Sequence, residues 1–557
     1  MKIRIYFLCA IGMMFFYACR KSDTVVPVPP PTPGSFSFNG LLVNGVYSGF
    51  VYYGVNARPV IKISFSTTID HSSAATAISF TDKSGAAVAF TPAFDNHDSA
   101  VVITPSGALQ PITQYSLLVS TALQSQQKGS LQSAITVMLL TAIDSADKFP
   151  RVSDSVLLTL VQQQTFHYFW DFGHPVSGMA RDRNTSGDVV ATGGTGFGIM
   201  SMVVAASRSF ITRAAAAGRI NTIVDFLTNT AVSYHGAFPH WINGVTGATV
   251  PFSANDDGAD LVETSYLMAG LLTARQYFNT ADPVETALVT KINALWNKVE
   301  WDWFRQNNQS VLYWHWSPDK GWIINMPIRG WNEALISYVL AASSTTHTID
   351  AGVYQDGWAL DGSIRNGATY YGYTLPLGPN LGGPLFFEHF SFLGVNPNGL
   401  TDQYAAYQTQ TTNHTLVNYS YCRANPNNFY GYSDSCWGLT ASDIPGGGYS
   451  ASSPTNDIGV IAPTAALSSL PYTPVQSMQA LKFFYYKLGD KLWGQYGFYD
   501  AFSLKDTWFA SSTLAIDQGP IIIMIENYRS GLIWNLFMSC PEIKTGLLKL
   551  GFQGPHI

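Results

Sequence analysis

The residues best suited to chemistry in this chain are carboxylates, and three of them, Asp256, Asp260 and Glu263, lie close together. Their spacings of four and three place them on one face if the segment is helical. If the helix begins nearer Gly258, Asp256 lies in the loop above it. Three like charges this close cost free energy unless protons, a cation or hydroxyl groups intervene. Because helix capping explains one Asp and not a stripe of three, we expect these residues to accept hydrogen bonds from a ligand's hydroxyl groups.

A second candidate, Glu333, follows Gly330, Trp331 and Asn332 at the expected start of a helix, downstream of a Trp-rich segment. A carboxyl group beside aromatic rings can keep its proton to higher pH and so act as a general acid. Two effects oppose this interpretation. A helix N-terminus favours the ionised form, and Glu at the third helical position is the usual capping-box residue. The residues alone leave both roles open for Glu333.

A third candidate, Asp517, stands just before the apolar run Ile521–Ile525 and is a natural N-cap, so a base and a cap both fit it. His389, Trp437 and Asp443 also deserve consideration as ligand contacts. A lone His among Phe residues is usually a hydrogen-bonded core residue. Trp437 is followed by glycine, which indicates an exposed ring on which a sugar could stack.

Several common catalytic motifs are absent from the sequence, namely G-x-S-x-G, H-E-x-x-H, the P-loop and C-x-x-C. The glycine-rich segment Gly194–Gly198 lacks a preceding strand and an acidic partner, so we interpret it as the approach to a helix. The five cysteines form neither a disulfide framework nor a zinc-ligand cluster. Cys422 and Cys436 could pair after export or stay reduced. These absences remove the usual signals of serine hydrolases, zinc proteases and nucleotide enzymes, and we expect no cofactor.

Composition supports a large core and a neutral ligand. Of the 557 residues, 46% are hydrophobic, 14% are aromatic and only 12% are charged, which excludes disorder for most of the chain. The net charge is −6 and the basic residues are spread thinly, so a nucleic-acid partner is not expected. Many amphipathic rings with few charges suit a neutral, polar ligand.

The first residues have the features of an export signal. Lys2 and Arg4 precede a short apolar run that ends at Cys19, so residues 1–19 have the form of a signal peptide. The last four of these residues resemble a bacterial lipobox, with Phe16 in place of the usual Leu. The Pro-rich residues 20–35 predict an extended spacer. We expect an exported protein, lipidated at Cys19 and anchored in the bacterial envelope, with no other membrane contact. Plain secretion with cleavage near Ala18 is the alternative.

Residues 36–142 alternate with a period of two, as in Pro59–Ser66 and Ala100–Ile103, with Gly, Pro, Asp and Ser turns between the runs. This pattern predicts an antiparallel sandwich of about seven strands. The segments Pro59–Ser66, Ile69–Asp70 and Leu109–Tyr115 resemble bacterial Ig-like domains. No acid or base stands out in this part, so we expect it to serve as a spacer or docking module.

Residues 148–557 change to a helical period. Ser153 can cap a helix, and Asp282, Pro283 and Glu285 combine an N-cap, a Pro at the first helical position and a Glu able to close a capping box. Further helices are expected near residues 198, 212, 260, 332, 401, 474 and 519. A dozen helices joined by aromatic loops favour an all-α (α/α)6 toroid with a concave mouth at one end.

Five segments in this order resemble the glucoamylase-like domain of glycoside hydrolase family 144, the β-1,2-glucanases: Gln163–Trp170, Asp256–Glu263, Gly330–Glu333, Cys436–Asp443 and Ile516–Pro520. The resemblance covers roughly residues 150–557. It implies an (α/α)6 barrel and an inverting glycosidase without a metal, with Glu333 as general acid and Asp517 as general base. The family's acidic cleft residues map onto Asp256, Asp260, Glu263, Glu333 and Asp517. We expect the substrate contacts to be Asp256, Asp260, Glu263, Trp331, Asn332, His389, Trp437 and Asp443.

The chemistry of glycoside hydrolysis agrees with these residues, because it uses one carboxyl group to protonate the leaving oxygen and another to activate water. Three alternatives remain open. One is an exo-acting, sophorose-releasing enzyme or a hydrolase of another glucan. The others are a non-catalytic, glycan-binding surface lipoprotein and a polysaccharide lyase, although a lyase prefers a Tyr, His or Lys base and basic residues. We expect a monomer that binds a neutral glucan or glucooligosaccharide.

Overall fold

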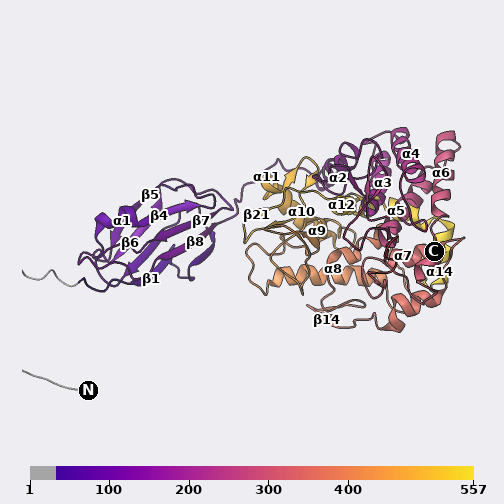
Figure 1. Cartoon of the computed structure of the whole chain (residues 1–557). Coiled ribbons are helices and arrows are strands. Elements are labelled where there is room, and N and C mark those ends of the chain that lie inside the picture. Colours follow the sequence, from indigo (N-terminus) through magenta and orange to yellow (C-terminus); the bar gives the residue numbers. More distant parts are fainter. Residues whose placement is uncertain (1–32) are drawn as a thin grey trace, which may run out of the picture. The chain divides into compact units, whose positions relative to one another are not determined.

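The computed structural model describes residues 33–557 (Figure 1), so the signal peptide, Cys19 and most of the Pro-rich spacer lie outside the described residues. By contacts, the chain separates into two compact units. One contains Pro59–Gly107, Ser116–Val137 and the segment that ends at Phe50, and the other contains Val51–Arg58, Ala108–Tyr115 and Met138–Ile557. Among the described helices, none combines the length and the apolar character needed to cross a bilayer.

The region from Phe38 to Thr141 is a β-sandwich of two four-stranded sheets. Alternate residues are buried, as Ile61, Ile63 and Phe65 illustrate. The strand pairs β1–β3, β3–β6 and β5–β6 are antiparallel, but β2 and β8 are parallel. The sequence pattern therefore predicted the sandwich and missed one strand and this parallel pair. One sheet has the strand order β1 (Phe38–Val43), β3 (Ile61–Phe65), β6 (Ala100–Pro105), β5 (Phe90–Asp95). The other sheet has the order β2 (Val51–Val55), β8 (Ile135–Thr141), β7 (Gln114–Val119), β4 (Ile78–Asp82).

A short helix that the alternation did not predict, α1 (His71–Ala77), leads into β4. Its N-cap is Asp70, whose side chain accepts a hydrogen bond from the backbone N–H of Ser72. Asp and Ser at the first positions of a helix favour capping over continued strand, because their side chains satisfy backbone N–H groups locally.

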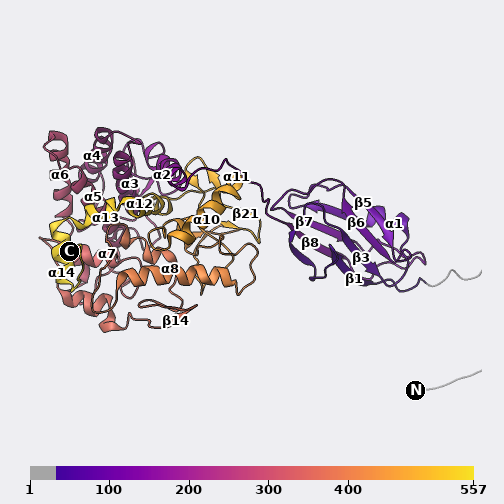
Figure 2. The ribbon, with the colours of Figure 1, turned by 180° about the vertical axis from the view of Figure 1, so that it is seen from behind.

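The region after Asp147 is helical, with short hairpins between the helices (Figures 1 and 2). Its helices are α2 (Asp154–Trp170), α3 (Thr192–Ser207), α4 (Arg213–Asn229), α5 (Leu261–Tyr277), α6 (Pro283–Trp296), α7 (Leu335–Ser343), α8 (Tyr407–Ala424), α9 (Pro463–Leu467), α10 (Pro474–Tyr486), α11 (Gly489–Leu492), α12 (Ala515–Ser530), α13 (Leu532–Met538) and α14 (Pro541–Lys549). The strands are β9 (Val189–Ala191), β10 (Trp241–Asn243), β11 (Thr249–Val250), β12 (Ala259–Asp260), β13 (His315–Trp316), β14 (Thr369–Tyr370), β15 (Tyr373–Thr374), β16 (Ala441–Asp443), β17 (Tyr449–Ala451), β18 (Trp493–Gly494), β19 (Gly497–Phe498), β20 (Phe502–Ser503) and β21 (Trp508–Phe509).

Two helix starts follow the capping signals in the sequence. Ser153 caps α2 and accepts from the N–H of Val156, and Asp282 caps α6 with Pro at the first helical position. The capping box expected for α6 is not formed. The carboxylate of Glu285 instead binds the guanidinium of Arg213 at 2.6 Å and the hydroxyl of Thr280 at 2.7 Å, since a nearby cation attracts it more strongly than a backbone N–H.

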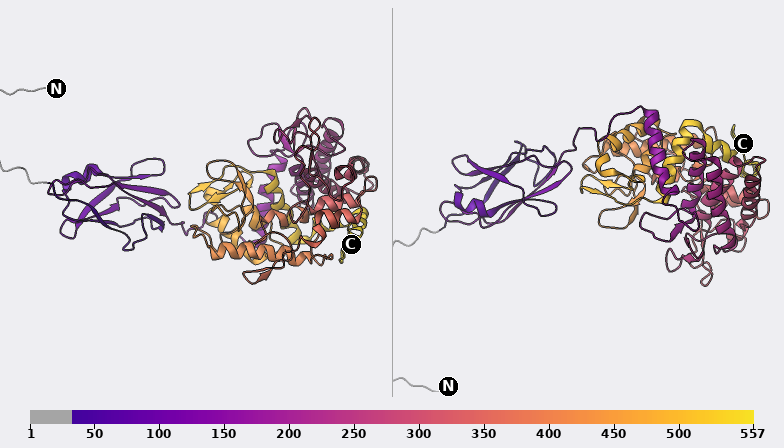
Figure 3. Two further views of the ribbon diagram at one scale, coloured as in Figure 1. Left: turned by 60° about the horizontal axis from the view of Figure 1, so that its bottom comes forward. Right: turned by 90° about the horizontal axis from the view of Figure 1, so that it is seen from above.

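Helices α3, α5, α7, α9 and α12 are buried around most of their surface, whereas α4, α6 and α10 bury one side only. Helix α3 packs on α5 and α12, and the view from above shows α3 to α6 side by side (Figure 3, right). The glycines of the segment expected to approach a helix lie inside α3. A Cβ on Gly196 would meet the carbonyl oxygen of Tyr266 at 2.1 Å, so glycine is what allows α3 and α5 to pack this closely. An inner group of buried helices thus faces an outer group of amphipathic ones.

Candidate active site

A cavity of about 400 Å³ lies where the N-terminal ends of α3, α5 and α12 meet the turn before α7. Because helix N-termini carry partial positive charge, this end of the helices suits carboxylates and polar ligands. The cavity is lined by Asp182, Arg183, Ala191, Gly194, His240, Trp241, Phe252, Glu263, Tyr266, Trp314, Glu333, Phe386, Phe390, Ala441, Tyr449, Leu514, Ile516 and Asp517.

Glu333 reaches this cavity from a turn that precedes α7, not from the helix itself. Its backbone oxygen accepts hydrogen bonds from the hydroxyls of Ser391 and Tyr266, which fix the turn. Burial, reinforced by the negative charges of Asp260 and Glu263, raises the pKa of Glu333 to about 7. A carboxyl group that keeps its proton near neutrality can donate it to a leaving group.

Asp260 and Glu263 have different roles: the first caps helix α5 and the second lines the cavity. Asp260 is the N-cap of α5 and accepts from the N–H groups of Val262 at 3.0 Å and Glu263 at 2.9 Å. Glu263 lines the cavity and accepts from the N–H of Gly193 at 2.7 Å. A Cβ on Gly193 would meet the Glu263 carboxylate at 2.6 Å, so glycine is needed here. Burial raises the pKa of Glu263 to about 7.

Two histidines that sequence reasoning missed lie against these carboxylates. His240 Nδ1 is 3.2 Å from Asp260 Oδ2, and His315 Nε2 is 3.4 Å from Asp256 Oδ2. Although burial opposes it, the charge of Glu263 and the contact with Asp260 raise the pKa of His240 to about 9. Strand pairing brings Asp260 opposite His315, a contact across 55 positions of sequence that no local motif signals.

This group includes atoms spaced as metal ligands can be. Ligand atoms of His240, Asp256 and Asp260 lie within 4.8 Å of one another. The contacts with His240 and His315 are ion pairs if the imidazoles are protonated, and such pairs compensate the carboxylate charges. Asp256 lies in the loop before α5, as expected if the helix begins near or after Gly258.

Asp517 is the third residue of α12 and lines the cavity, so it is not the N-cap that its sequence position suggested. Burial and the neighbouring Asp500 carboxyl raise the pKa of Asp517 well above its usual range.

Asp443 lies beside Asp500 and Asp517. It accepts a hydrogen bond from the Ser512 hydroxyl at 2.5 Å, and its N–H donates to Asp500 Oδ2 at 2.6 Å. Asp500, like the histidines, was not among the residues predicted from sequence.

Aromatic rings form much of the remaining wall. Trp241 and Phe252 lie with their ring centroids 4.8 Å apart, and Phe390 lies 5.6 Å from Tyr266. Faces of this kind stack on sugar rings, while the carboxylates and His240 offer hydrogen-bonding partners to hydroxyl groups. The cavity therefore combines several carboxyl groups with apolar aromatic surfaces.

Of the eight residues expected to contact the ligand, only Glu263 is among the lining residues of this cavity. Asp256, Asp260 and Asp443 lie just behind it, in the contacts described above, and four others are held elsewhere. Trp331 is buried and its indole N–H donates to Glu388 at 2.8 Å, while the side chain of Asn332 accepts from the N–H of Ala334. His389 is buried against the hydroxyl of Ser469 at 2.9 Å, and burial lowers its pKa to about 3. The expectation that Trp437 is exposed is wrong, because its ring is fully buried in the core.

The cysteines of the described residues are unpaired. Cys422, Cys436 and Cys540 are buried free thiols. Burial raises the pKa of the Cys422 thiol above its usual range. The possible pairing of Cys422 with Cys436 is therefore not formed in this structure.

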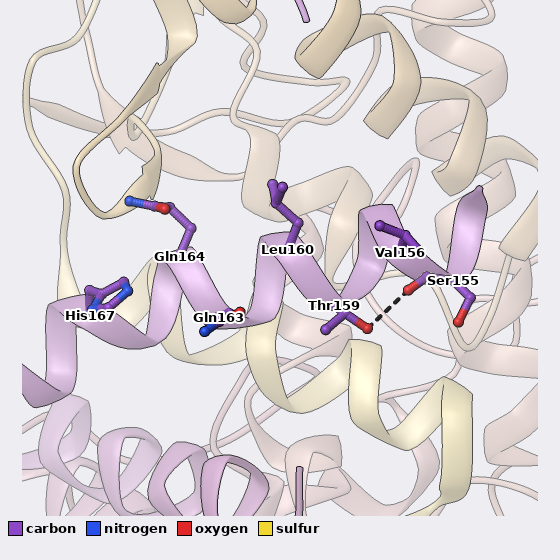
Figure 4. A pocket seen from close by; sticks show the side chains of 7 residues that line it. All are labelled: Ser155, Val156, Thr159, Leu160, Gln163, Gln164 and His167. Carbon is purple, nitrogen blue, oxygen red and sulfur yellow. Dashed lines mark hydrogen bonds between the residues drawn. The ribbon is translucent and has the colours of Figure 1, made fainter. Parts of the chain in front are cut away.

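A larger depression, of about 480 Å³, lies on the outside of α2 and contains no acidic side chain (Figure 4). It is lined by Ser155, Val156, Thr159, Leu160, Gln163, Gln164 and His167, and the hydroxyl of Thr159 donates to the carbonyl oxygen of Ser155. Size alone therefore does not identify the reactive site, since this depression lacks an acid and base pair.

Comparison with known families divides the chain in the same way. Residues 325–541 match the family Glycoamylase, described as "Putative glucoamylase", and residues 52–140 match a bacterial Ig-like domain.

Relatives match over most of the chain. The exo β-1,2-glucooligosaccharide sophorohydrolase (non-reducing end) of Parabacteroides distasonis is 44% identical over 429 residues, which are 73% of this chain and 59% of that protein. The chain thus spans less than two thirds of that relative's length.

Two solved structures are also similar. The endo-β-1,2-glucanase of Chitinophaga pinensis is 49% identical, with a TM-score of 0.71, over 73% of this chain and 100% of that one. A β-1,2-glucanase of Parabacteroides distasonis is 35% identical, with a TM-score of 0.70, over 94% of this chain and 74% of that one.

Proposed function

Since this chain belongs to the glucoamylase-like domains of glycoside hydrolase family 144, we propose that it is a glycoside hydrolase that cleaves β-1,2-glucan with inversion at the anomeric carbon. In this proposal Glu333 is the general acid and Asp517 is the general base. The observation that carries it is that both carboxyl groups line one cavity whose walls also carry aromatic rings.

The proposed reaction needs a proton donor and a proton acceptor on the two sides of the scissile bond. Glu333, protonated near neutral pH, gives its proton to the glycosidic oxygen as the bond to the anomeric carbon breaks. Water adds to that carbon from the opposite face and loses its proton to Asp517. The hydroxyl groups of the sugar bind Glu263 and His240, which line the same cavity.

We also propose that the helical region is an (α/α)6 toroid. Its support is the separation of buried inner helices, such as α3, α5 and α12, from amphipathic outer ones. Gathering of the inner N-termini at one cavity is the arrangement that such a toroid would give.

The proposed function is tested by product analysis. We expect the full-length protein to hydrolyse linear β-1,2-glucan and to leave β-1,3-glucan, β-1,4-glucan and starch intact, with products sized by chromatography. Early release of a ladder of oligosaccharides would indicate endo action. No cleavage of β-1,2-linked substrates of any length would overturn the proposal.

A second candidate is exo action with release of sophorose. Its support is the 44% identity to a relative that is an exo sophorohydrolase. In that case sophorose accumulates as the sole early product while the remaining glucan shortens slowly. The product pattern therefore separates the two candidates in one experiment.

We propose that the protein is an exported lipoprotein held in the envelope by Cys19, with the Ig-like domain as a spacer or docking module, and that it acts as a monomer. The support is the apolar run that ends at Ala18 and Cys19.

We expect Cys19→Ser to move the protein from the membrane fraction to the soluble fraction, as measured by immunoblotting after fractionation. Unchanged membrane association would contradict lipidation at this residue.

A further inference from the structure

Asp500 is a buried carboxyl that belongs to no role assigned so far. It is 3% exposed and lies in the turn between β19 and β20, upstream of α12. One of its oxygens, Oδ2, accepts the N–H of Asp443 at 2.6 Å. The other, Oδ1, is buried and has no hydrogen-bond partner.

Asp517 also has a carboxyl oxygen without a hydrogen-bond partner. It is 5% exposed, and its Oδ2 is likewise buried without a hydrogen-bond donor. The two carboxyl groups are within hydrogen-bonding contact of each other. Two carboxylates cannot bond, because both only accept. One added proton converts one of them into a donor, which allows a hydrogen bond that two carboxylates cannot form.

On the basis of the proposed function, we propose that Asp500 is a positioning residue that shares one proton with Asp517, so that the base acts as half of a carboxyl dyad. The pair then holds one proton and one negative charge before reaction. When water attacks, its oxygen bonds to the anomeric carbon and its proton enters the pair, which then holds two protons. Glu333 supplies the proton for the leaving oxygen, so the charges balance across the step.

The surroundings of the pair favour one negative charge over two. The charged and titratable groups that face it are Asp443 on β16, Tyr449 on β17, and Asp182 and Arg183 from the segment after α2. Arg183 is the only cation among these groups, and its guanidinium is 3.3 Å from Asp443, which shares its charge. Burial first, and then the negative charge of Asp443, raises the pKa of Asp500 to about 7. Two carboxyls in contact ionise in separate steps that belong to the pair.

The direct test is infrared difference spectroscopy of the full-length protein, which detects the C=O stretch of a protonated carboxylic acid without any substrate. At about pH 8.5, Glu263 and Glu333, whose pKa values are about 7, are largely ionised. The proposal requires the pair to keep its shared proton at this pH. We expect a carboxylic-acid band in the wild type that is lost in both Asp500→Asn and Asp517→Asn. Asp225→Asn, a surface replacement of the same kind, keeps the band.

Two outcomes would overturn the dyad: the absence of the band in the wild type, and its persistence in Asp500→Asn. Because the replaced amide can still accept the N–H of Asp443, this variant should fold, and its circular dichroism verifies that. Asp500→Ser, which also removes the carboxyl, serves if the first variant does not fold. This readout is independent of hydrolysis, so a failure of the proposed function leaves it intact.

Kinetics give the second test. In Asp500→Asn an amide replaces the protonated partner of the Asp517 carboxylate and donates a weaker hydrogen bond to it, so the acidic limb of the kcat/KM profile on β-1,2-glucan moves to higher pH. The amide also cannot share the proton that water releases, and kcat falls by roughly 10-fold. A merely structural role would lower kcat with the acidic limb unmoved, and that result would contradict the proposal.

Discussion

Glu333→Gln and Asp517→Asn each lower kcat on β-1,2-glucan by roughly 10²–10⁴-fold, the usual contribution of a general acid or a general base. Both changes keep the shape of the side chain and remove its ability to exchange a proton. Because each residue lines the cavity from a different element, substrate should still bind, so kcat falls more than KM changes. Initial rates with a reducing-end assay, together with binding measured by calorimetry, check this expectation.

The pH profile distinguishes the acid from its neighbours. Glu333 must be protonated to act, and its pKa is about 7, so activity is lost as pH rises through that value. In Glu333→Gln the residual activity no longer has this alkaline limb. Glu263→Gln is the matched control, because Glu263 has a similar pKa of about 7 but contacts the N–H of Gly193. We expect it to weaken binding and keep the limb.

Near wild-type turnover in either amide variant, with thermal stability unchanged, would return that residue to a structural role. The acid and base would then have to be sought among Asp256, Asp260, Glu263 and Asp443. Loss of folding in a variant would be visible in its circular dichroism and would not count for or against the assignment.

Glu388→Ala should destabilise the helical region by about 3–5 kcal/mol, the usual cost of breaking a buried charged pair from one side. The side chain of Glu388 is fully buried, and its Oε1 contacts Trp331 Nε1, Gln410 Nε2 and His414 Nδ1, each at 2.8 Å. Its removal leaves these groups without their partner. Denaturant unfolding followed by tryptophan fluorescence measures the loss.

The same replacement should reduce kcat, because Trp331 anchors the turn that carries Glu333. Glu300→Ala is the matched control, since Glu300 also contacts a histidine, His235 at 2.8 Å, but both side chains are partly exposed. Exposed pairs contribute about 0–1 kcal/mol. If the two replacements had equal effects on stability, the network around Glu388 would not hold the turn as we infer.

The candidate acid and base could be found from sequence because Glu333 and Asp517 stand in short segments that resemble a family. The starts of two helices could be found from local capping signals, since Ser153 and Asp282 are the N-caps of α2 and α6. Local patterns could not reveal that the ring of Trp437 is buried, because a Trp next to glycine is compatible with both an exposed and a buried ring. Its full burial depends on residues far along the chain, such as Gln476, whose backbone oxygen accepts its indole N–H.

The residues that sequence reasoning missed share one property, which is that their partners are distant. His315 meets Asp260 through strand pairing, and Asp500 meets Asp517 across a turn and a helix start. Neither histidine nor aspartate carries a spacing signal on its own. Such residues become visible only when the fold brings their charges together, because burial then penalises every charge that lacks a partner.

The three buried thiols of the described residues have a practical consequence. Cys422, Cys436 and Cys540 lie in the core of the helical region, and burial raises the pKa of each, so the folded protein presents no thiolate there. Alkylating reagents react with thiolates and need access to them. The rate at which these positions become labelled therefore records how often the helical region opens, and it does so without added dyes or substrate.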